Sequence, residues 1–253
     1  VFEHTIAQNT VVSVSGLFSW GRNLTTVVDD NLPALSGTRT YNVNGGPFGG
    51  QNVTVNNYFG ARPDANFGRI SEIRSTIDSN YAALVLQLNR RLTDGLQFNA
   101  SYTLSDAEDN GQTSNTFTPF AGNNPSDPFD LSLEEGKSRF HVPHRFVANL
   151  VYAPETILGL GKNNETAKAI LRGWSFAPIV TIQSGAAYSA GIDDDLWGAN
   201  GSRIFPGVSR NGLSQPYVAN VDLRISRRFN FSESKTLEIL AEGFNILNRQ
   251  NIT

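Results

Sequence analysis

The 253-residue sequence contains no cysteine and no methionine. Without cysteine it can form neither a disulfide framework nor a thiolate metal site, and cysteine-based catalysis is excluded. Because translation starts at methionine and position 1 is Val1, we expect the chain to be a fragment or a processed product. No secretory leader is recognisable at its N-terminus.

Charge and long apolar runs are also scarce. Charged residues make up 17% of the chain, below the roughly 25% of soluble domains. The net charge of -3 gives no basic footprint for nucleic acid, so we expect no such partner. No run approaches the ~18 apolar residues of a membrane helix. A nucleophile elbow and a phosphate loop are missing too, and no carboxylate pair stands out for hydrolysis. We therefore expect no enzyme activity and no cofactor.

The stretch from Asn80 to Ser105 carries the strongest pattern. Apolar and polar residues alternate on both sides of Asp94-Gly95, which predicts a hairpin of two strands. One face is apolar, with Leu84, Leu86, Leu88, Phe98, Ala100, Tyr102 and Leu104; the other is neutral and polar, with Gln87, Asn89, Gln97, Asn99 and Ser101. Two such faces are typical of a barrel wall between lipid and a watery lumen.

The remaining alternation predicts an all-β antiparallel meander. We expect about seven strands, at 10–20, 69–91, 96–107, 144–153, 173–189, 217–231 and 236–248. Minor elements are a turn at Gln8-Asn9 after a polar segment, a small hairpin at Tyr41–Val43 and Asn52–Val55, and a helix at Glu165–Leu171. Long loops (21–68, 108–140 and 190–216) alternate with short or medium connections, as in outer-membrane barrels. An open edge in lipid is costly, so residues 1–253 are expected to form one domain that is part of a transmembrane β-barrel.

Four segments together carry a family resemblance. They are FGRISEIRSTIDSNYAALVLQLNRRLTDGLQFNASYTLSDAEDNGQ, FDLSLEEGKSRFHVPHRFVANLVY, RGWSFAPIVTIQSGAAYS, and FPGVSRNG followed by VANVDLRISRRFNF and TLEILAEGFNILNRQN. In this order they resemble the C-terminal part of TonB-dependent receptors of the Oar-like group, in the bacterial outer membrane. Family members usually finish on an aromatic residue, whereas this chain ends at Thr253.

The resemblance implies an active transporter with a 22-stranded barrel. A plug domain would fill the lumen, and a TonB-type energy-coupling protein would drive transport. The plug, the coupling box, the first strands and the closing strand would lie outside this chain. Ligands in the family include iron chelates, vitamins, glycans and possibly proteins or peptides, so the extracellular ligand stays unknown.

Candidate metal sites each have a simpler interpretation. His141 and His144 lie three apart, but Pro143 breaks the strand start between them. Asp193, Asp194 and Asp195 loosely resemble an acidic calcium loop, without the spacing and terminal Glu of an EF-hand. A solvated loop tip is the simpler interpretation, so we expect no metal site here. We expect Asp106, Glu108 and Asp109 to be a solvated strand end, and Glu134-Glu135 with Lys137 and Arg139 to be a charged loop.

Charges and aromatic residues are expected to follow the membrane boundaries. Arg90-Arg91 and Arg227-Arg228 would lie at periplasmic strand ends, as interfacial charge or in contact with the plug or lipid head groups. Lumen-facing charges would pair across strands: Asp222, Arg224, Arg228, Glu238 and Glu242. Aromatic girdles would comprise Tyr152, Trp174, Phe176, Phe229 and Phe231 at the inner boundary, and Trp20, Tyr188 and Phe244 at the outer one.

The functional hypothesis is energised uptake of a bulky nutrient, captured by the three long loops. Two alternatives remain open from the sequence. One is a binding or adhesion protein of the outer membrane that transports nothing. The other is a soluble carbohydrate-binding β-sandwich.

Overall fold

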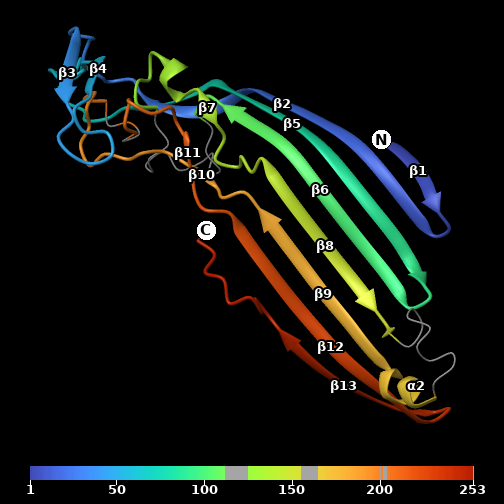
Figure 1. Ribbon diagram of the computed structural model, residues 1–253. Helices are drawn as coiled ribbons and strands as arrows, with labels where there is room; N and C mark the ends of the chain where they lie inside the picture. The colour runs from blue at the N-terminus through green and yellow to red at the C-terminus, as the bar shows by residue number, and fades with distance from the viewer. Residues whose placement is uncertain (112–124, 155–164, 200, 202–203, 253) are drawn as a thin grey trace.

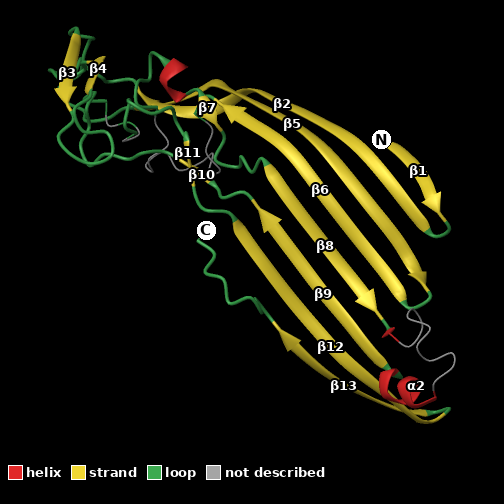
Figure 2. Cartoon of the chain, in the orientation of Figure 1, coloured by secondary structure: helices red, strands yellow, loops and turns green. Residues whose placement is uncertain are grey.

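A computed structural model describes residues 1–111, 125–154, 165–199, 201 and 204–252. One large antiparallel sheet dominates it, with strands in the order β1-β2-β5-β6-β8-β9-β12-β13 and a short β7 beside β6 (Figures 1 and 2). The order follows the chain, so the sheet is the predicted meander. It is curved and does not close: β1 and β13 are its two edges.

The strands of this sheet differ widely in length. Their bounds are β1 Phe2–Ala7, β2 Thr10–Asp29, β5 Ser71–Thr93, β6 Leu96–Asp109, β7 Gly136–Lys137, β8 His144–Tyr152, β9 Trp174–Gln183, β12 Val218–Ser232 and β13 Lys235–Gly243. Two small hairpins pair β3 (Thr38–Asn42) with β4 (Asn52–Asn56), and β10 (Ala187–Tyr188) with β11 (Leu213–Ser214). The helices are a 3-10 turn, η1 (Leu131–Glu134), and α2 (Glu165–Leu171), the latter with the predicted bounds. None of the described helices has the length and apolar character needed to span a membrane.

The register of the β5–β6 hairpin confirms the predicted faces. Leu84 pairs with Leu104, and Gln87 pairs with Ser101. Asp94 and Gly95 both have positive φ (53° and 72°), which suits a two-residue turn whose twist matches the strands. The polar row continues to Ser13 of β2, whose hydroxyl donates to Gln87 Oε1 at 3.2 Å.

The apolar face of the sheet is uncovered, whereas some side chains of the polar face are buried. On the apolar face, Phe18, Leu84 and Ile239 are 68%, 42% and 58% exposed. On the polar face, Ser13 and Ser226 are buried, as expected where side chains converge on the inside of a curved sheet. A soluble sheet covers its apolar face instead, so this sheet is arranged for a surrounding that is itself apolar.

The sheet differs from the prediction at four places. The polar start of the chain forms an additional strand, β1, before the predicted turn, where Asn9 has φ 63°. Strand β2 continues past Trp20 to Asp29, because irregular pairing near Gly21–Thr25 absorbs the break in alternation. Strand β9 ends at Gln183, and β10 leaves to join β11. Strand β13 ends at Gly243 and not at 248, since Asn245 and Asn248 have positive φ.

Candidate ligand-binding cap

The long loops gather at one end of the sheet, around β3, β4, β7, β10 and β11, while short turns and α2 lie at the other end (Figure 1). We call this gathered part the cap; its described residues are 30–70, 125–143, 184–199, 201 and 204–217. By the asymmetry of outer-membrane barrels, the long loops lie outside the cell and the short turns in the periplasm. The cap is therefore the part that an external ligand meets first.

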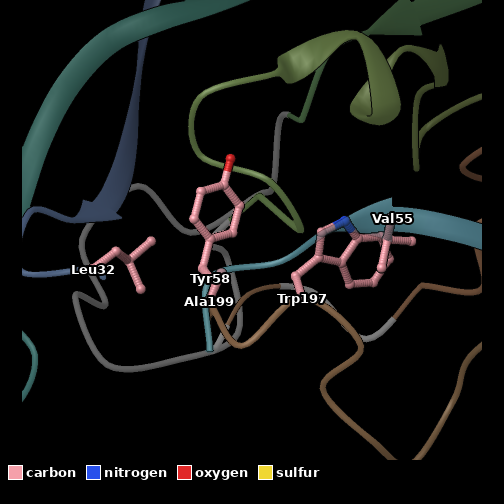
Figure 3. Packing of buried hydrophobic residues seen from close by; sticks show 5 residues of the cluster. All are labelled: Leu32, Val55, Tyr58, Trp197 and Ala199. Atoms are coloured by element: carbon pink, nitrogen blue, oxygen red, sulfur yellow. The ribbon is translucent and has the colours of Figure 1, made fainter. Parts of the chain in front are cut away.

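The cap has an apolar core of its own. It consists of the buried side chains of Leu32, Val55, Tyr58, Trp197 and Ala199 (Figure 3). The first three belong to the predicted loop 21–68 and the last two to the predicted loop 190–216. Tyr41 packs against this core, and its hydroxyl donates to the Leu196 carbonyl at 2.9 Å. Two loops far apart in sequence thus form one packed unit.

The third loop joins through Asp127, which is fully buried. Its carboxylate accepts hydrogen bonds from the Tyr58 hydroxyl at 2.8 Å, from Asn56 Nδ2 at 2.7 Å and from the Phe129 backbone N–H at 2.9 Å. Burial first, and then the hydrogen bond to Asp127, raise the pKa of Tyr58 well above its ordinary value. Tyr58 therefore stays neutral and keeps donating to Asp127.

A buried charge cluster fixes the cap to the top of β6. The Arg210 guanidinium contacts Asp109 through Nη2 and donates from Nε to the Glu134 carbonyl. The Glu134 carboxylate accepts from the Ser126 backbone N–H at 2.6 Å. The prediction of solvated positions at Asp109 and Glu134 was wrong: they are 5% and 2% exposed. A buried carboxylate needs a partner, and that partner, Arg210, is far away in sequence.

A second buried pair holds the cap to the end of β2. Arg62 Nη1 lies 2.8 Å from the carboxylate of Asp29, which is buried. Beside it, the buried side chain of Asn31 donates to the carbonyls of Asp64, Phe67 and Gly68 and accepts from the Asp64 N–H. These bonds satisfy the backbone of a turn-rich segment that has no strand partner.

The other two acidic residues of the predicted strand end, Asp106 and Glu108, contact Lys137. Its Nζ contacts Asp106 and Glu108 at 2.7 and 2.8 Å, and these hydrogen bonds raise the pKa of Lys137. His141 lies against the same group, 3.2 Å from Asp106, and burial followed by the Lys137 charge lowers the pKa of His141. His144, in contrast, bonds the Tyr102 hydroxyl at 2.8 Å on the apolar face, so the two histidines make different contacts.

The candidate calcium loop is placed beside the core. The Asp195 carboxylate accepts from the backbone N–H groups of Trp197 and Gly198 at 3.1 and 2.9 Å. Within the described residues, no three acidic or histidine side chains come together in a way that could hold a metal ion. The expectation that Asp193, Asp194 and Asp195 hold no metal stays a prediction, and Asp195 has a structural task in a turn.

A hollow of about 180 Å³ opens beside Trp197, with Ser132, Glu135 and Phe205 among its lining residues. The indole Nε1 of Trp197 is buried and has no acceptor among the residues that the structure describes. A buried donor without a partner is costly, and because this nitrogen is shielded from solvent it does not present its N–H to the hollow. Sequence reasoning missed this site, and the only signal was an isolated tryptophan in a polar loop.

At the opposite end, aromatic rings line the apolar face as predicted. Tyr152, Phe176 and Trp174 form a chain of rings with centroids 6.4 and 6.2 Å apart. On the polar face, the predicted cross-strand ion pairs are present: Arg224 with Glu242 at 2.8 Å, and Arg228 with Glu238 at 3.2 Å. Asp222 instead accepts from Asn220 Nδ2 and the Asn245 N–H.

Comparisons with known proteins agree with this architecture. A family model described as "Outer membrane beta barrel domain" matches residues 1–204. Among solved structures, the outer membrane transporter YddB from Escherichia coli is similar, with a TM-score of 0.52 and 10% sequence identity; the match covers 98% of this chain and 28% of that one. At this identity the likeness concerns the fold alone. A sequence search of curated proteins found no match.

Proposed function

Given that the chain belongs to the outer membrane β-barrel domain family, we propose that it is part of a receptor that takes up a bulky nutrient through its barrel. The chain is located in the outer membrane, with its exposed apolar face toward lipid. It spans about 28% of the length of the similar transporter, so the activity of the whole protein is part of the proposal.

The observation that carries the proposal is the cap. Its three loops are joined by an apolar core around Trp197 and by the buried carboxylates of Asp127 and Asp109. These contacts hold the three loops in one defined shape at the outer mouth of the barrel. The hollow beside Trp197, lined by the apolar side chain of Phe205 and by the polar ones of Ser132 and Glu135, is the candidate place for a ligand.

The polar wall below the cap supports passage. Its side chains are mostly neutral amides and hydroxyls, such as Gln87, Asn99 and Asn149, and Asn99 Nδ2 donates to Asn149 Oδ1 at 3.0 Å. Neutral polar side chains form only weak hydrogen bonds with an oxygen-rich solute, so they allow it to pass without binding it tightly. TonB dependence, an Oar-like architecture and a plug domain enter the proposal from the sequence resemblance. The proposed role involves no enzyme activity.

A binding or adhesion role is the second candidate, favoured by the same packed cap. The soluble β-sandwich is not proposed, since the chain belongs to an outer-membrane family and its strands lie side by side in one layer.

Uptake assays distinguish the two roles. Cells with and without the full-length protein would be given a labelled ferric hydroxamate chelate, cobalamin or a maltodextrin, each with and without a protonophore. We expect one probe to accumulate in a protonophore-sensitive manner and Trp197→Ala to reduce both its binding and its uptake. Leu237→Ala, on the apolar face of β13, is the control. Surface binding without energised uptake would favour adhesion instead.

A further inference from the structure

Arg227 occupies an unusual position for a charged residue. On β12 it pairs with Trp174 of β9 on one side and with Ile239 of β13 on the other. These neighbours lie on the apolar face of the sheet, near the end that carries the short turns and α2 (Figure 1). The guanidinium is therefore held on the lipid side of the wall, at the inner boundary.

Among the described side chains, Arg227 has no counter-ion. Its Cζ lies 5.3 Å from the ring centroid of Trp174 and 4.9 Å from that of Phe229. Its Nη2 reaches the Ala169 carbonyl only at 3.4 Å. Its Nε is buried and has no hydrogen-bond partner in the described part of the chain.

The neighbouring residue shows what a lumen-facing arginine does instead. Arg228, on the opposite face, pairs with Glu238 at 3.2 Å, whereas no carboxylate among the described side chains lies within ion-pair distance of Arg227. A hollow of about 740 Å³ also opens at this end, and its lining includes Arg228 and Glu238 of the polar face besides Trp174 and Arg227. It reaches both faces of the sheet, so the lipid-side position of Arg227 rests on the strand register and the ring contacts.

We propose that Arg227, with Trp174 and Phe229, binds the phosphate of an anionic phospholipid in the periplasmic leaflet. The guanidinium is weakly hydrated, stacks on rings and donates to phosphate oxygens through its fork of N–H groups. The rings hold it at the level of the head groups, where aromatic residues and arginine are favoured. The acyl chains would lie along the exposed apolar side chains of β12 and β13, such as Leu237 and Ile239.

The lipid site requires that the protein lies in the outer membrane, but not that it transports a nutrient. A failure to bind lipid would therefore leave the proposed uptake untouched, and a failure of uptake would leave the lipid site untouched. The test uses the full-length protein, delipidated in detergent and titrated with phosphatidylglycerol while native mass spectrometry counts bound lipid. Arg227→Gln removes the charge on the lipid side. Arg228→Gln removes the same charge one residue away on the lumen side and is the matched control. Arg227→Lys keeps the positive charge but removes the fork of guanidinium N–H groups.

We expect Arg227→Gln to weaken phosphatidylglycerol binding about fivefold, equivalent to the roughly 1 kcal/mol that one basic residue contributes near an anionic lipid surface. Arg228→Gln should change the affinity for phosphatidylglycerol less than twofold. The affinity of Arg227→Lys should lie between those of wild type and Arg227→Gln. Equal binding by wild type and Arg227→Gln, or an equal loss in both Gln variants, would overturn the proposal. Competition by inorganic phosphate as effective as that by the lipid would also overturn it, because the site would then be a phosphate site and not a lipid site.

Discussion

Replacing Arg210 by methionine should open the cap without disturbing the membrane sheet. The side chain of Arg210 is 6% exposed, and those of Asp109 and Glu134 are 0% and 3% exposed. Methionine fills a similar volume but leaves both carboxylates buried without their cation. Breaking a buried pair in this way costs about 3–5 kcal/mol, which corresponds to roughly two to four orders of magnitude in a local opening equilibrium.

Hydrogen exchange on the full-length protein measures this opening by segment. We expect faster exchange in 125–138 and 204–214, with unchanged protection in β5 and β6. Arg224→Met is the matched control, because its pair with Glu242 has exposed fractions of 54% and 41% and such a pair contributes about 0–1 kcal/mol.

A compensating variant tests the cause. Asp109→Asn and Glu134→Gln combined with Arg210→Met should recover part of the protection, because no uncompensated charge is then buried. If Arg210→Met changes exchange in the cap no more than Arg224→Met does, the buried cluster does not hold the cap and the reasoning fails.

Three further predictions test other parts of the molecule. Leu86→Arg, on the apolar face, should lower the stability of the barrel in lipid by about 2–4 kcal/mol, whereas Gln87→Arg should have little effect; equal losses in denaturant titrations would refute the assignment of faces. Gly95→Ala should cost about 1–2 kcal/mol, because alanine resists the positive φ of the turn; an unchanged unfolding midpoint would contradict this. The lowered pKa of His141 favours the neutral imidazole in the folded cap. Its stabilising contribution is therefore present above about pH 6.5 and is lost as pH falls through the lowered value. Protection factors in the cap, which are corrected for the pH dependence of intrinsic exchange, should therefore fall from about pH 8 to about pH 5 more in wild type than in His141→Gln.

Much of the sheet could be predicted, because one face of each strand must suit lipid and the other water. That requirement produces a two-residue period in the sequence, which correctly assigned Leu84 and Leu104 to the apolar face and Gln87 and Ser101 to the polar face. The period fails where the backbone departs from a regular ladder. The irregular pairing near Gly21 hid the second half of β2, and the left-handed Asn245 ended β13 early.

The cap could not be predicted by the same means. Its contacts join residues that are far apart in sequence, such as Arg210 with Asp109 and Tyr58 with Asp127. In the sequence these carboxylates look like those of any solvated loop, because a contact between residues far apart in the chain produces no repeating pattern. The ion pairs of β12 and β13 were predictable for the opposite reason: they cross one tight hairpin, whose register fixes the neighbours of Arg224 and Arg228.

The length of β2 and β5 has a mechanical consequence. They have 20 and 23 residues, or roughly 65–80 Å of extended chain, whereas about 9–11 residues cross the apolar layer. The cap is therefore joined to the membrane sheet by one long pair of strands, whose ladder is interrupted only by the register shifts near Gly21–Thr25. A force that displaces the cap must strain the hydrogen bonds between these two strands, and the strain would reach the membrane wall directly.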